Sequence, residues 1–141
     1  MQPLAKQEAL IEQYSAIHDV QERMVLILDR ARRRPPLAEA EKTEAARVPG
    51  CVSRVWLRPS CAEGRCHFGI DADSALVRGL AAFLCEMYEG ATPAEVEAVE
   101  PHLLERLGIA ANLSPTRLHG LAQVRRAIRD FARAAQTEAV A

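Results

Sequence analysis

Cys51 is the residue of this chain best placed to do chemistry, because it follows a Pro49-Gly50 pair and precedes the run VSRVWL at residues 52–57. Proline fixes its own φ and glycine adopts backbone angles that other residues avoid, so the pair predicts a tight turn. The following run is rich in β-branched and aromatic residues, which predicts a strand. A thiol on a turn beside a rigid strand can be reached by another molecule. The alternative is a buried cysteine at the start of a strand, since free cysteine is among the most buried residue types.

Four candidate zinc ligands lie close together in the sequence: Cys51, Cys61, Cys66 and His67. Thiolate and imidazole groups are the ligands that zinc sites use. The spacing argues against such a site, because four residues separate Cys61 from Cys66 where a zinc knuckle has two. Cys66 and His67 are also neighbours on a predicted strand, so their side chains point to opposite faces. We therefore expect no bound metal.

The remaining cysteines are interpreted from the elements that contain them. Cys66 alternates with Phe68 and Ile70, which directs its side chain toward the core, whereas Cys61 falls in a hairpin loop. Cys85 lies in a predicted helix as a packing residue. A cross-strand disulfide between Cys61 and Cys66 is geometrically feasible. A reducing compartment and the inward direction of Cys66 favour two free thiols instead.

The composition indicates one intracellular domain. A chain of 141 residues buries roughly two-thirds of its unfolded surface and needs no disulfide or metal to fold. Its net charge of −1 lacks the basic excess of a nucleic-acid-binding face, so we expect no nucleic acid as a partner. The N-terminal sequence MQPLAKQEAL lacks the layout of a signal peptide, and no apolar run approaches the length of a membrane span. We expect a cytoplasmic protein with reduced cysteines and no membrane partner.

The pattern of the whole chain predicts an α+β fold. A hairpin is expected from strands at 52–57 and 65–70, with a loop at 59–64. Together with a short third strand, the hairpin forms a small antiparallel sheet that packs against several α-helices. The helices are expected to begin next to capping residues or prolines, namely Asp19, Asp73 or Ser74, Thr92, Glu100 and Ser114. The last helix carries four arginines opposite its apolar stripe, on a face expected to be solvated: Arg125, Arg126, Arg129 and Arg133.

Five segments match, in order, the pattern of one protein family: ERMVLILDRARRRPPL, VPGCVSRVWL, GIDADSALVRGLAAFL, YEGATPAEV and LGIAANLSPTRLHGL. The second segment carries the signature Val-x-Gly-Cys-x-Ser-x-Val-Trp-Leu, with Cys51 as its cysteine. From about residue 19 to residue 132, the chain resembles the SufE family, including its CsdE branch, the sulfur acceptors that partner cysteine desulfurases. It departs from the family pattern at Ala45 and Ala46, where Glu-Asn is usual, and at His119, where asparagine is usual.

The resemblance implies a sulfur-transfer function. Cys51 would take persulfide sulfur from a PLP-dependent cysteine desulfurase of the SufS or CsdA type, stimulate that enzyme, and pass the sulfur on for Fe–S cluster assembly. A downstream Fe–S scaffold would be a further partner. Gly50, Asp73, Arg117 and His119 would be binding residues. The protein would act as a carrier with a covalent persulfide rather than as a stand-alone enzyme, and it would have no cofactor of its own.

The resemblance also implies the organisation of the chain. We expect a single SufE-like domain over residues 1–141, similar in fold to the IscU scaffolds. About 15 residues at the N-terminus and about 8 at the C-terminus are expected to be peripheral, as chain ends usually are. The resemblance leaves room for a homodimer.

Sulfur transfer sets conditions on the surroundings of Cys51. The thiolate attacks the outer sulfur of a persulfide, so the thiol must be reachable and its anion stabilised. Arg47, Arg54 and Arg117 are the candidates for that stabilisation. Apolar flanking residues and the family resemblance predict a thiol tucked into a hydrophobic cavity, which raises its pKa. The docking surface is expected to join the cysteine turn, the helix start after Asp73 and the segment that begins at Arg117.

Two other functions are compatible with the same features. The domain could activate a desulfurase by docking alone, with Cys51 inert. It could also be an IscU-like Fe–S scaffold, which needs three cysteines, or two with His or Asp, around a cluster. The scaffold is disfavoured, because Cys61 is the sole plausible second ligand in the sequence. Replacing Cys51 by serine separates docking from transfer, since binding should survive and sulfur transfer should not.

Overall fold

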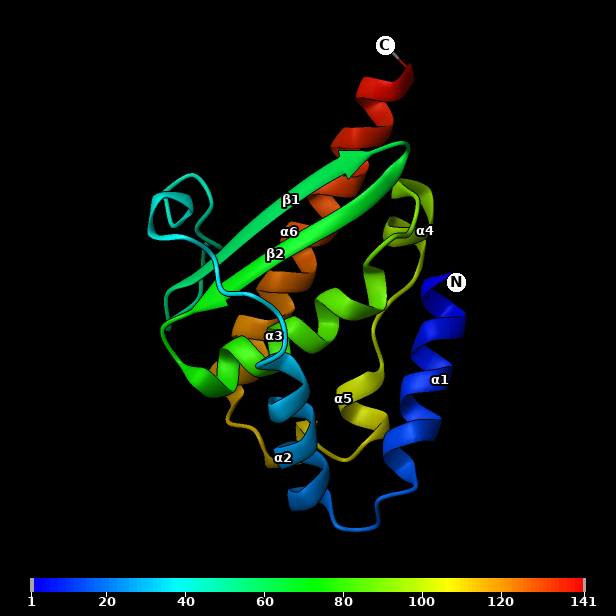
Figure 1. Cartoon of the computed structure of the whole chain (residues 1–141), viewed down its shortest axis with the longest axis vertical. Helices are drawn as coiled ribbons and strands as arrows, with labels where there is room; N and C mark the ends of the chain where they lie inside the picture. The colour runs from blue at the N-terminus through cyan, green and yellow to red at the C-terminus, as the bar shows by residue number, and fades with distance from the viewer. Residues whose placement is uncertain (1, 141) are drawn as a thin grey trace.

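The structure of the protein, a computed structural model, describes residues 2–140, with side chains to residue 138. The described residues form an α+β fold of six α-helices and one two-stranded antiparallel sheet, which confirms the predicted fold class (Figure 1). The sheet consists of β1 (Val55–Ala62) and β2 (Arg65–Ala72). The helices are α1 (Pro3–Ser15), α2 (Val20–Ala31), α3 (Ala75–Tyr88), α4 (Pro93–Ala98), α5 (Leu103–Arg106) and α6 (Pro115–Val140), with 3₁₀ turns at Glu39–Glu41 and Ala110–Asn112.

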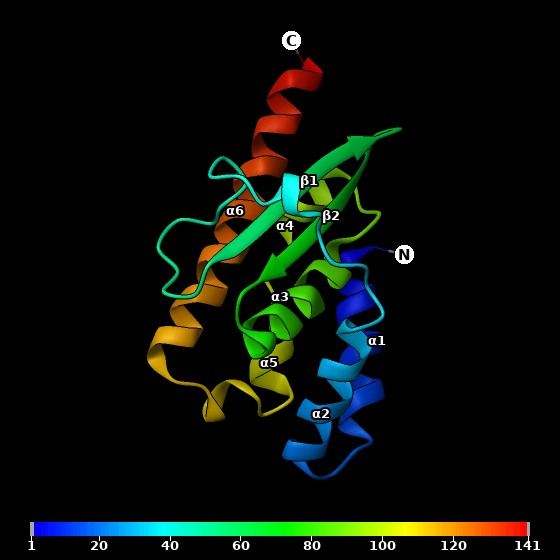
Figure 2. The same cartoon turned by 60° about the vertical axis from the view of Figure 1, so that its left-hand side comes forward.

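Helix α3 lies at the centre of the molecule. β2 packs on one side of it and α2 on another, and α1 and α6 also contact it (Figure 1, Figure 2). Ten of its residues are buried, so the helix is apolar on almost every side, as expected for a helix enclosed by other elements. At Gly79 the approach of α2 is so close that a Cβ atom would overlap the side chain of Leu28.

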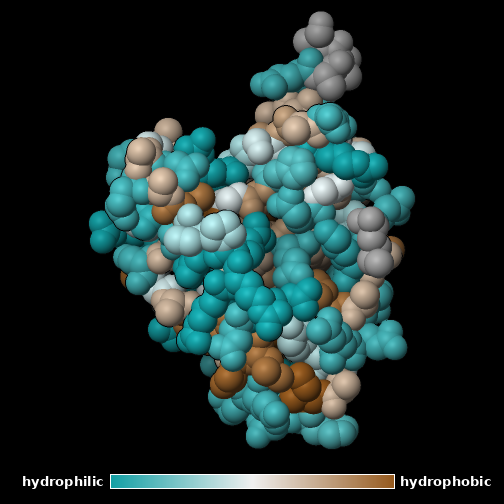
Figure 3. Space-filling view, in the orientation of Figure 1, coloured by the Kyte–Doolittle hydropathy of each residue, from teal (hydrophilic) through white to brown (hydrophobic). Residues whose placement is uncertain are grey.

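The face seen in Figure 3 is mostly hydrophilic. An apolar patch interrupts it at the end of the molecule formed by α2, where Val25 and Leu26 are exposed. None of the helices in the described part of the chain combines the length and the apolarity that crossing a bilayer would require.

Helices α2, α3, α4 and α6 start at the predicted residues, and the structure settles the one ambiguous cap. Helix α5 begins at Leu103, after His102, rather than at the start predicted next to Glu100. Asp19 caps α2 by accepting a hydrogen bond from the backbone N–H of Gln21 at 2.8 Å. The predicted capping box of α4 is present. Ser74 caps α3, because its Oγ accepts from the backbone N–H of Val77 at 3.3 Å. The carboxylate of Asp73 is therefore available for other contacts.

The hairpin is longer than the sequence pattern predicted. Its strands continue to a two-residue turn at Glu63 and Gly64, whose φ angles are +55° and +76°. Two consecutive residues with positive φ form the kind of turn whose twist matches that of the flanking strands. The loop predicted at 59–64 is therefore wrong, and Cys61 lies in β1 rather than in a loop.

Pro59 does not interrupt β1, although proline removes a backbone donor. Its partner across the sheet is Phe68, whose own N–H points away from β1 and donates to the carboxylate of Glu89 at 3.0 Å. Residues in such a pair direct their backbone polar groups outward from the hairpin. The missing N–H of Pro59 therefore faces the free edge of β1, and the sheet loses no hydrogen bond.

The third strand that the sequence predicted is reduced to a single bridge beside β1. The segment before the cysteine turn folds back along the outer edge of that strand. The N–H of Val48 donates to the carbonyl of Val55 at 2.8 Å, and the N–H of Leu57 donates to the carbonyl of Ala46 at 2.9 Å. Residues 49–54, which we call the Cys51 loop, reverse the chain between these bonds, so β1 begins later than predicted.

Arg125 is buried, so the prediction of a solvated arginine face is wrong at this position. Its guanidinium donates to the carbonyls of Val96 at 2.9 Å and Glu97 at 3.1 Å, near the end of α4. Its Cζ also lies 4.8 Å from the centre of the Tyr88 ring. The last carbonyls of a helix lack partners within the helix, and a guanidinium supplies several donors at once. The close packing of α4 on α6 creates this role.

A buried carboxylate fastens the segment between α2 and the sheet. The side chain of Asp71 is 7% exposed and lies 3.3 Å from Arg78 Nε and 3.5 Å from Lys42 Nζ. It also accepts a hydrogen bond from the backbone N–H of Leu37 at 3.2 Å. Three groups that are separate in the sequence thus share one anion.

We expect Asp71→Asn to lower the free energy of unfolding by about 1–3 kcal/mol, because the neutral amide leaves two cations without their shared carboxylate. Urea denaturation followed by circular dichroism measures the change. The control is Glu41→Gln, which removes an exposed pair with Arg58 (3.6 Å) and should cost less than about 1 kcal/mol. Equal losses in the two variants would contradict the anchoring role of Asp71.

Candidate functional site

The Cys51 loop lies between β1 and α6 (Figure 2). Gly50 has a φ of +81°, a left-handed conformation that strains residues with a side chain, so Pro49 and Gly50 form the predicted turn. The next residue, Cys51, is half-buried, whereas the side chain of Val52 is 81% exposed. The loop thus directs a thiol inward and an apolar group outward. The thiol was expected to be tucked into a hydrophobic cavity, and in the structure it is only partly buried.

The thiol of Cys51 points to the backbone of α6. Its Sγ lies 3.4 Å from the carbonyl oxygen of Gly120, which accepts the S–H hydrogen bond. A Cβ atom on Gly120 would lie 3.7 Å from that sulfur, so a longer side chain there would compete with the sulfur for space. The backbone of α6 thus passes close to the thiol at Gly120, where an added Cβ would meet the sulfur in ordinary van der Waals contact.

A hollow of about 390 Å³ opens beside the sulfur. Three segments that are distant in the sequence line it, namely the Cys51 loop, α3 through Val77, and the start of α6 from Ser114 to Gly120. These are the segments expected to form the docking surface. Sequence reasoning did not single out Val77 or Thr116 as lining residues, because the first matches a core pattern and the second a helix start. The sequence signal that could have indicated Thr116 is its position between the Ser114-Pro115 helix start and Arg117.

Burial raises the pKa of the Cys51 thiol above its ordinary value, and the positive charge of Arg47 offsets part of that rise. The carbonyl of Gly120 favours the same state, because only the protonated thiol can donate a hydrogen bond to it. Arg54 is directed elsewhere, since its Nε lies 3.3 Å from the carboxylate of Asp73. The resting group is therefore a protonated thiol.

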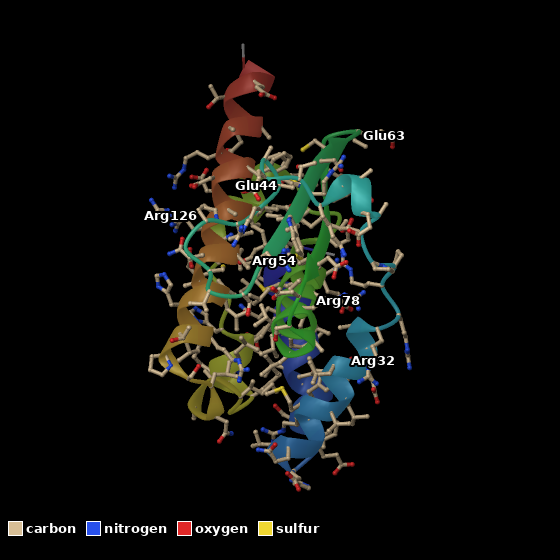
Figure 4. The ribbon with its side chains drawn as sticks, turned by 90° about the vertical axis from the view of Figure 1, so that its left-hand side faces the viewer. Arg32, Glu44, Arg54, Glu63, Arg78 and Arg126 are labelled. Carbon is tan, nitrogen blue, oxygen red and sulfur yellow. The ribbon has the colours of Figure 1, made fainter. Side chains whose placement is uncertain are left out.

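Asp73 and Arg54 close the base of the Cys51 loop. The carboxylate of Asp73 accepts from the backbone N–H of Arg54 at 3.1 Å, and the N–H of Asp73 donates to the carbonyl of Arg54 at 3.0 Å. With the ion pair, these bonds tie the end of the loop to the residue that follows β2. Figure 4 shows Arg54 on the β1 side of the loop and Arg126 on the α6 side. Asp73 thus holds the loop rather than lining the hollow.

Arg117, Gly50 and His119 occupy two different places around the loop. The exposed side chain of Arg117 lines the hollow beside the sulfur, and the described residues include no carboxylate paired with it. Gly50 lines a second hollow of about 400 Å³ together with residues of α6 that include Gln123. His119 lies next to that hollow, with its Nε2 at 3.4 Å from Gln123 Nε2. The structure therefore brings Arg117 to Cys51 and places His119 by the turn.

The other cysteines have environments unlike that of Cys51. Cys66 in β2 and Cys85 in α3 are fully buried, and burial raises the pKa of each thiol to about 12. The predicted inward direction of Cys66 is confirmed. Cys61 is exposed. Within residues 2–138 no three His, Cys, Asp or Glu side chains are grouped so as to hold a metal ion.

Comparison with known proteins places the chain in a family. Residues 8–132 match the model of the SufE family, described as an Fe–S metabolism associated domain. The chain is 42% identical over 96 residues to the sulfur acceptor protein CsdE of Escherichia coli K12, which spans 67% of this chain and 65% of CsdE. It is 31% identical over 111 residues to an uncharacterized SufE-like protein of Synechocystis sp., spanning 79% of this chain and 70% of that protein.

The similarity also extends to part of a larger protein and to a solved structure. The chain is 41% identical over 110 residues to chloroplastic quinolinate synthase of Oryza sativa subsp. japonica. The matched stretch covers 77% of this chain but only 16% of that protein. The solution structure of a hypothetical protein from Thermus thermophilus has a TM-score of 0.76 and 21% identity, covering 94% of this chain and 96% of the other. At that identity the structure demonstrates a shared fold.

We expect Cys51 in the folded protein to react with iodoacetamide more slowly than in the urea-unfolded chain, with a pH profile displaced to higher pH. The reason is that a raised pKa leaves less thiolate at any given pH, and thiolate is the reacting species. Peptide mapping after timed quenching measures each cysteine separately. Exposed Cys61 should react faster than Cys51, and buried Cys85 should not react before unfolding. Equal rates for Cys51 in the two states would show that the loop gives no shelter.

Proposed function

Because this chain belongs to the SufE family of Fe–S metabolism associated domains, we propose that it is a sulfur acceptor for a PLP-dependent cysteine desulfurase of the SufS or CsdA type. Cys51 receives the sulfur as a persulfide, the protein stimulates the desulfurase, and the sulfur passes on to Fe–S cluster assembly. The similarity to a protein named as a sulfur acceptor supports this role. The proposal takes the chain as one domain that acts in the cytoplasm.

The observation that carries the proposal is the position of the Cys51 thiol on a tethered loop beside an open hollow. The hollow of about 390 Å³ has room next to the sulfur for a second sulfur atom and for a group that delivers it. Arg117 contributes a permanent positive charge to this hollow. The exposed side chain of Val52 offers a partner an apolar contact next to the reacting atom.

The transfer is a thiol–persulfide exchange. The Cys51 thiol loses its proton and its sulfur attacks the outer sulfur of the persulfide on the desulfurase cysteine. The bond between the two sulfurs of the desulfurase persulfide breaks as the new bond to Cys51 Sγ forms. The desulfurase cysteine leaves as a thiolate and takes up the proton. One thiol and one persulfide enter and leave the reaction, so no external oxidant or reductant is needed.

The raised pKa of Cys51 makes this transfer depend on the partner. In the free protein the thiol is protonated and bonded to the Gly120 carbonyl, which limits its reaction with small oxidants. A docked desulfurase that draws the loop out would break that bond and bring the sulfur into a more polar site. The pKa of Cys51 would then fall, and the thiolate would form where the persulfide is presented.

The alternative functions are less well supported. A docking activator with an inert cysteine gives no reason for an open hollow beside the thiol. An Fe–S scaffold would need Cys61 as the second ligand, and Cys61 lies near the far end of β1 from the Cys51 loop. At a strand rise of about 3.3 Å per residue, Val55 and Cys61 are already about 20 Å apart.

Incubation with a cysteine desulfurase, PLP and cysteine should add sulfur to the protein, and mass mapping should locate it on the peptide that contains Cys51. We expect Cys51→Ser to abolish the addition while leaving binding to the desulfurase intact, because the loop keeps its shape without the thiol. Isothermal titration calorimetry measures the binding. Sulfur found mainly on Cys61 or Cys85 would overturn the assignment, and stimulation by the serine variant would favour the docking activator.

Arg117→Ala should weaken stimulation of the desulfurase while leaving the thermal midpoint nearly unchanged, because the Arg117 side chain is exposed and lines the hollow. The control is Arg32→Ala, which removes an exposed arginine of another face (Figure 4) whose partner is Asp29 at 2.8 Å. The control should stimulate as the parent does. If Arg117→Ala unfolds early and its folded fraction stimulates normally, Arg117 has a structural role.

A further inference from the structure

Two cysteines face each other beside the hairpin turn. The turn is at the end of the hairpin remote from the Cys51 loop (Figure 1). Cys61 of β1 and Cys66 of β2 are direct partners in the register, and their Sγ atoms lie 3.7 Å apart. Neither thiol has a part in the proposed sulfur transfer. The pair is therefore a second place on the molecule, apart from Cys51, where thiols could react.

The backbone hydrogen bonds show which kind of strand pair the two cysteines form. The N–H of Cys66 donates to the carbonyl of Ala91 at 2.7 Å, and its carbonyl accepts from the N–H of Gly90 at 2.8 Å. Both polar groups of Cys66 thus point away from β1, which makes Cys61 and Cys66 a non-hydrogen-bonded pair. In such pairs the Cα atoms are about 4.5 Å apart and the side chains are closest, within the separation that a disulfide spans.

The two thiols differ in access. Cys61 is exposed, whereas Cys66 is fully buried with a pKa raised to about 12, chiefly by that burial. A reagent from solution therefore meets Cys61 first, and Cys66 can respond only to a group already attached to Cys61. This is the arrangement of an attacking thiol with a resolving thiol beside it, and the raised pKa of Cys66 makes the attack of the resolving thiol the slower step.

We propose that Cys61 and Cys66 form a redox site that closes to a disulfide by exchange with a low-molecular-weight disulfide such as glutathione disulfide. The Cys61 thiolate attacks one sulfur of the small disulfide and expels the first small thiol. Cys66 then loses its proton, attacks the Cys61 sulfur of the mixed disulfide and expels the second small thiol. Two protein thiols are oxidised and one small disulfide is reduced to two thiols, so atoms and electrons balance.

This site is separate from the proposed sulfur acceptor. The distance of about 20 Å along β1 keeps the pair out of reach of Cys51 within one chain. The bond would close a loop of a few residues around the hairpin turn, and short loops gain little stability from a cross-link. The disulfide would therefore act as a reversible redox device rather than as a structural brace, and the resting protein would hold two thiols.

The test uses full-length protein with Cys51→Ser, so that the sulfur acceptor does not react, and glutathione disulfide as the probe. We expect the protein to lose two hydrogen atoms in mass and to retain no glutathione. Trypsin cuts after Arg65, between the two cysteines, so the peptides ending at Arg65 and beginning at Cys66 stay together only if a disulfide joins them. Dithiothreitol should separate them and restore the mass.

The matched control is Cys51→Ser with Cys66→Ala, or with Cys66→Ser if the alanine variant does not fold. It should retain one glutathione on Cys61, because the resolving thiol is missing. The proposal is overturned if the protein with Cys66 keeps glutathione as the control does, or if its two peptides remain separate. Persulfide loading of Cys51 is measured in the Cys61→Ala, Cys66→Ala protein, where it should equal that of the parent. Each proposal can therefore fail without the other.

Discussion

The site depends on the backbone hydrogen bonds that hold the chain on both sides of the Cys51 loop. Before the loop, Val48 is bonded to Val55 on the outer edge of β1. At its end, Arg54 and Asp73 bond through backbone and side chain. Ordering a loop costs conformational entropy, and fixing its ends on rigid elements reduces the entropy that the loop residues still have to lose. The thiol at the tip therefore has a defined position against α6 instead of moving through solvent.

Shelter and reactivity oppose each other at Cys51, and the structure favours shelter. Partial burial and the Gly120 carbonyl both stabilise the neutral thiol, while Arg47 acts in the opposite direction. A carrier of persulfide sulfur benefits from this balance, because a thiolate exposed in the free protein would be consumed by other oxidants. Under the proposed function, the energy of docking is what converts the sheltered thiol into a nucleophile.

The register of the hairpin determines the environments of both Cys61 and Cys66. β1 leads from the Cys51 loop to Cys61, and the two-residue turn at Glu63 and Gly64 sets which residue of β2 faces which residue of β1. A slip of one residue would turn Cys66 from the core to the outer face and separate it from Cys61. Because the turn lies at Glu63 and Gly64, the strands continue through most of the residues predicted as a loop, and this places Cys61 opposite Cys66.

The sequence by itself determined the features that depend on neighbours along the chain. These are the helix caps, the turn at Gly50, the inward face of β2 and the family signature around Cys51, because capping, φ preference and strand alternation act over a few residues. The tertiary structure alone decided the bond from Cys51 to Gly120, the pairing of Asp73 with Arg54, and the burial of Arg125. Each of these joins residues far apart in the sequence, and which distant groups meet is set by the packing of whole elements, about which local periodicity carries no information.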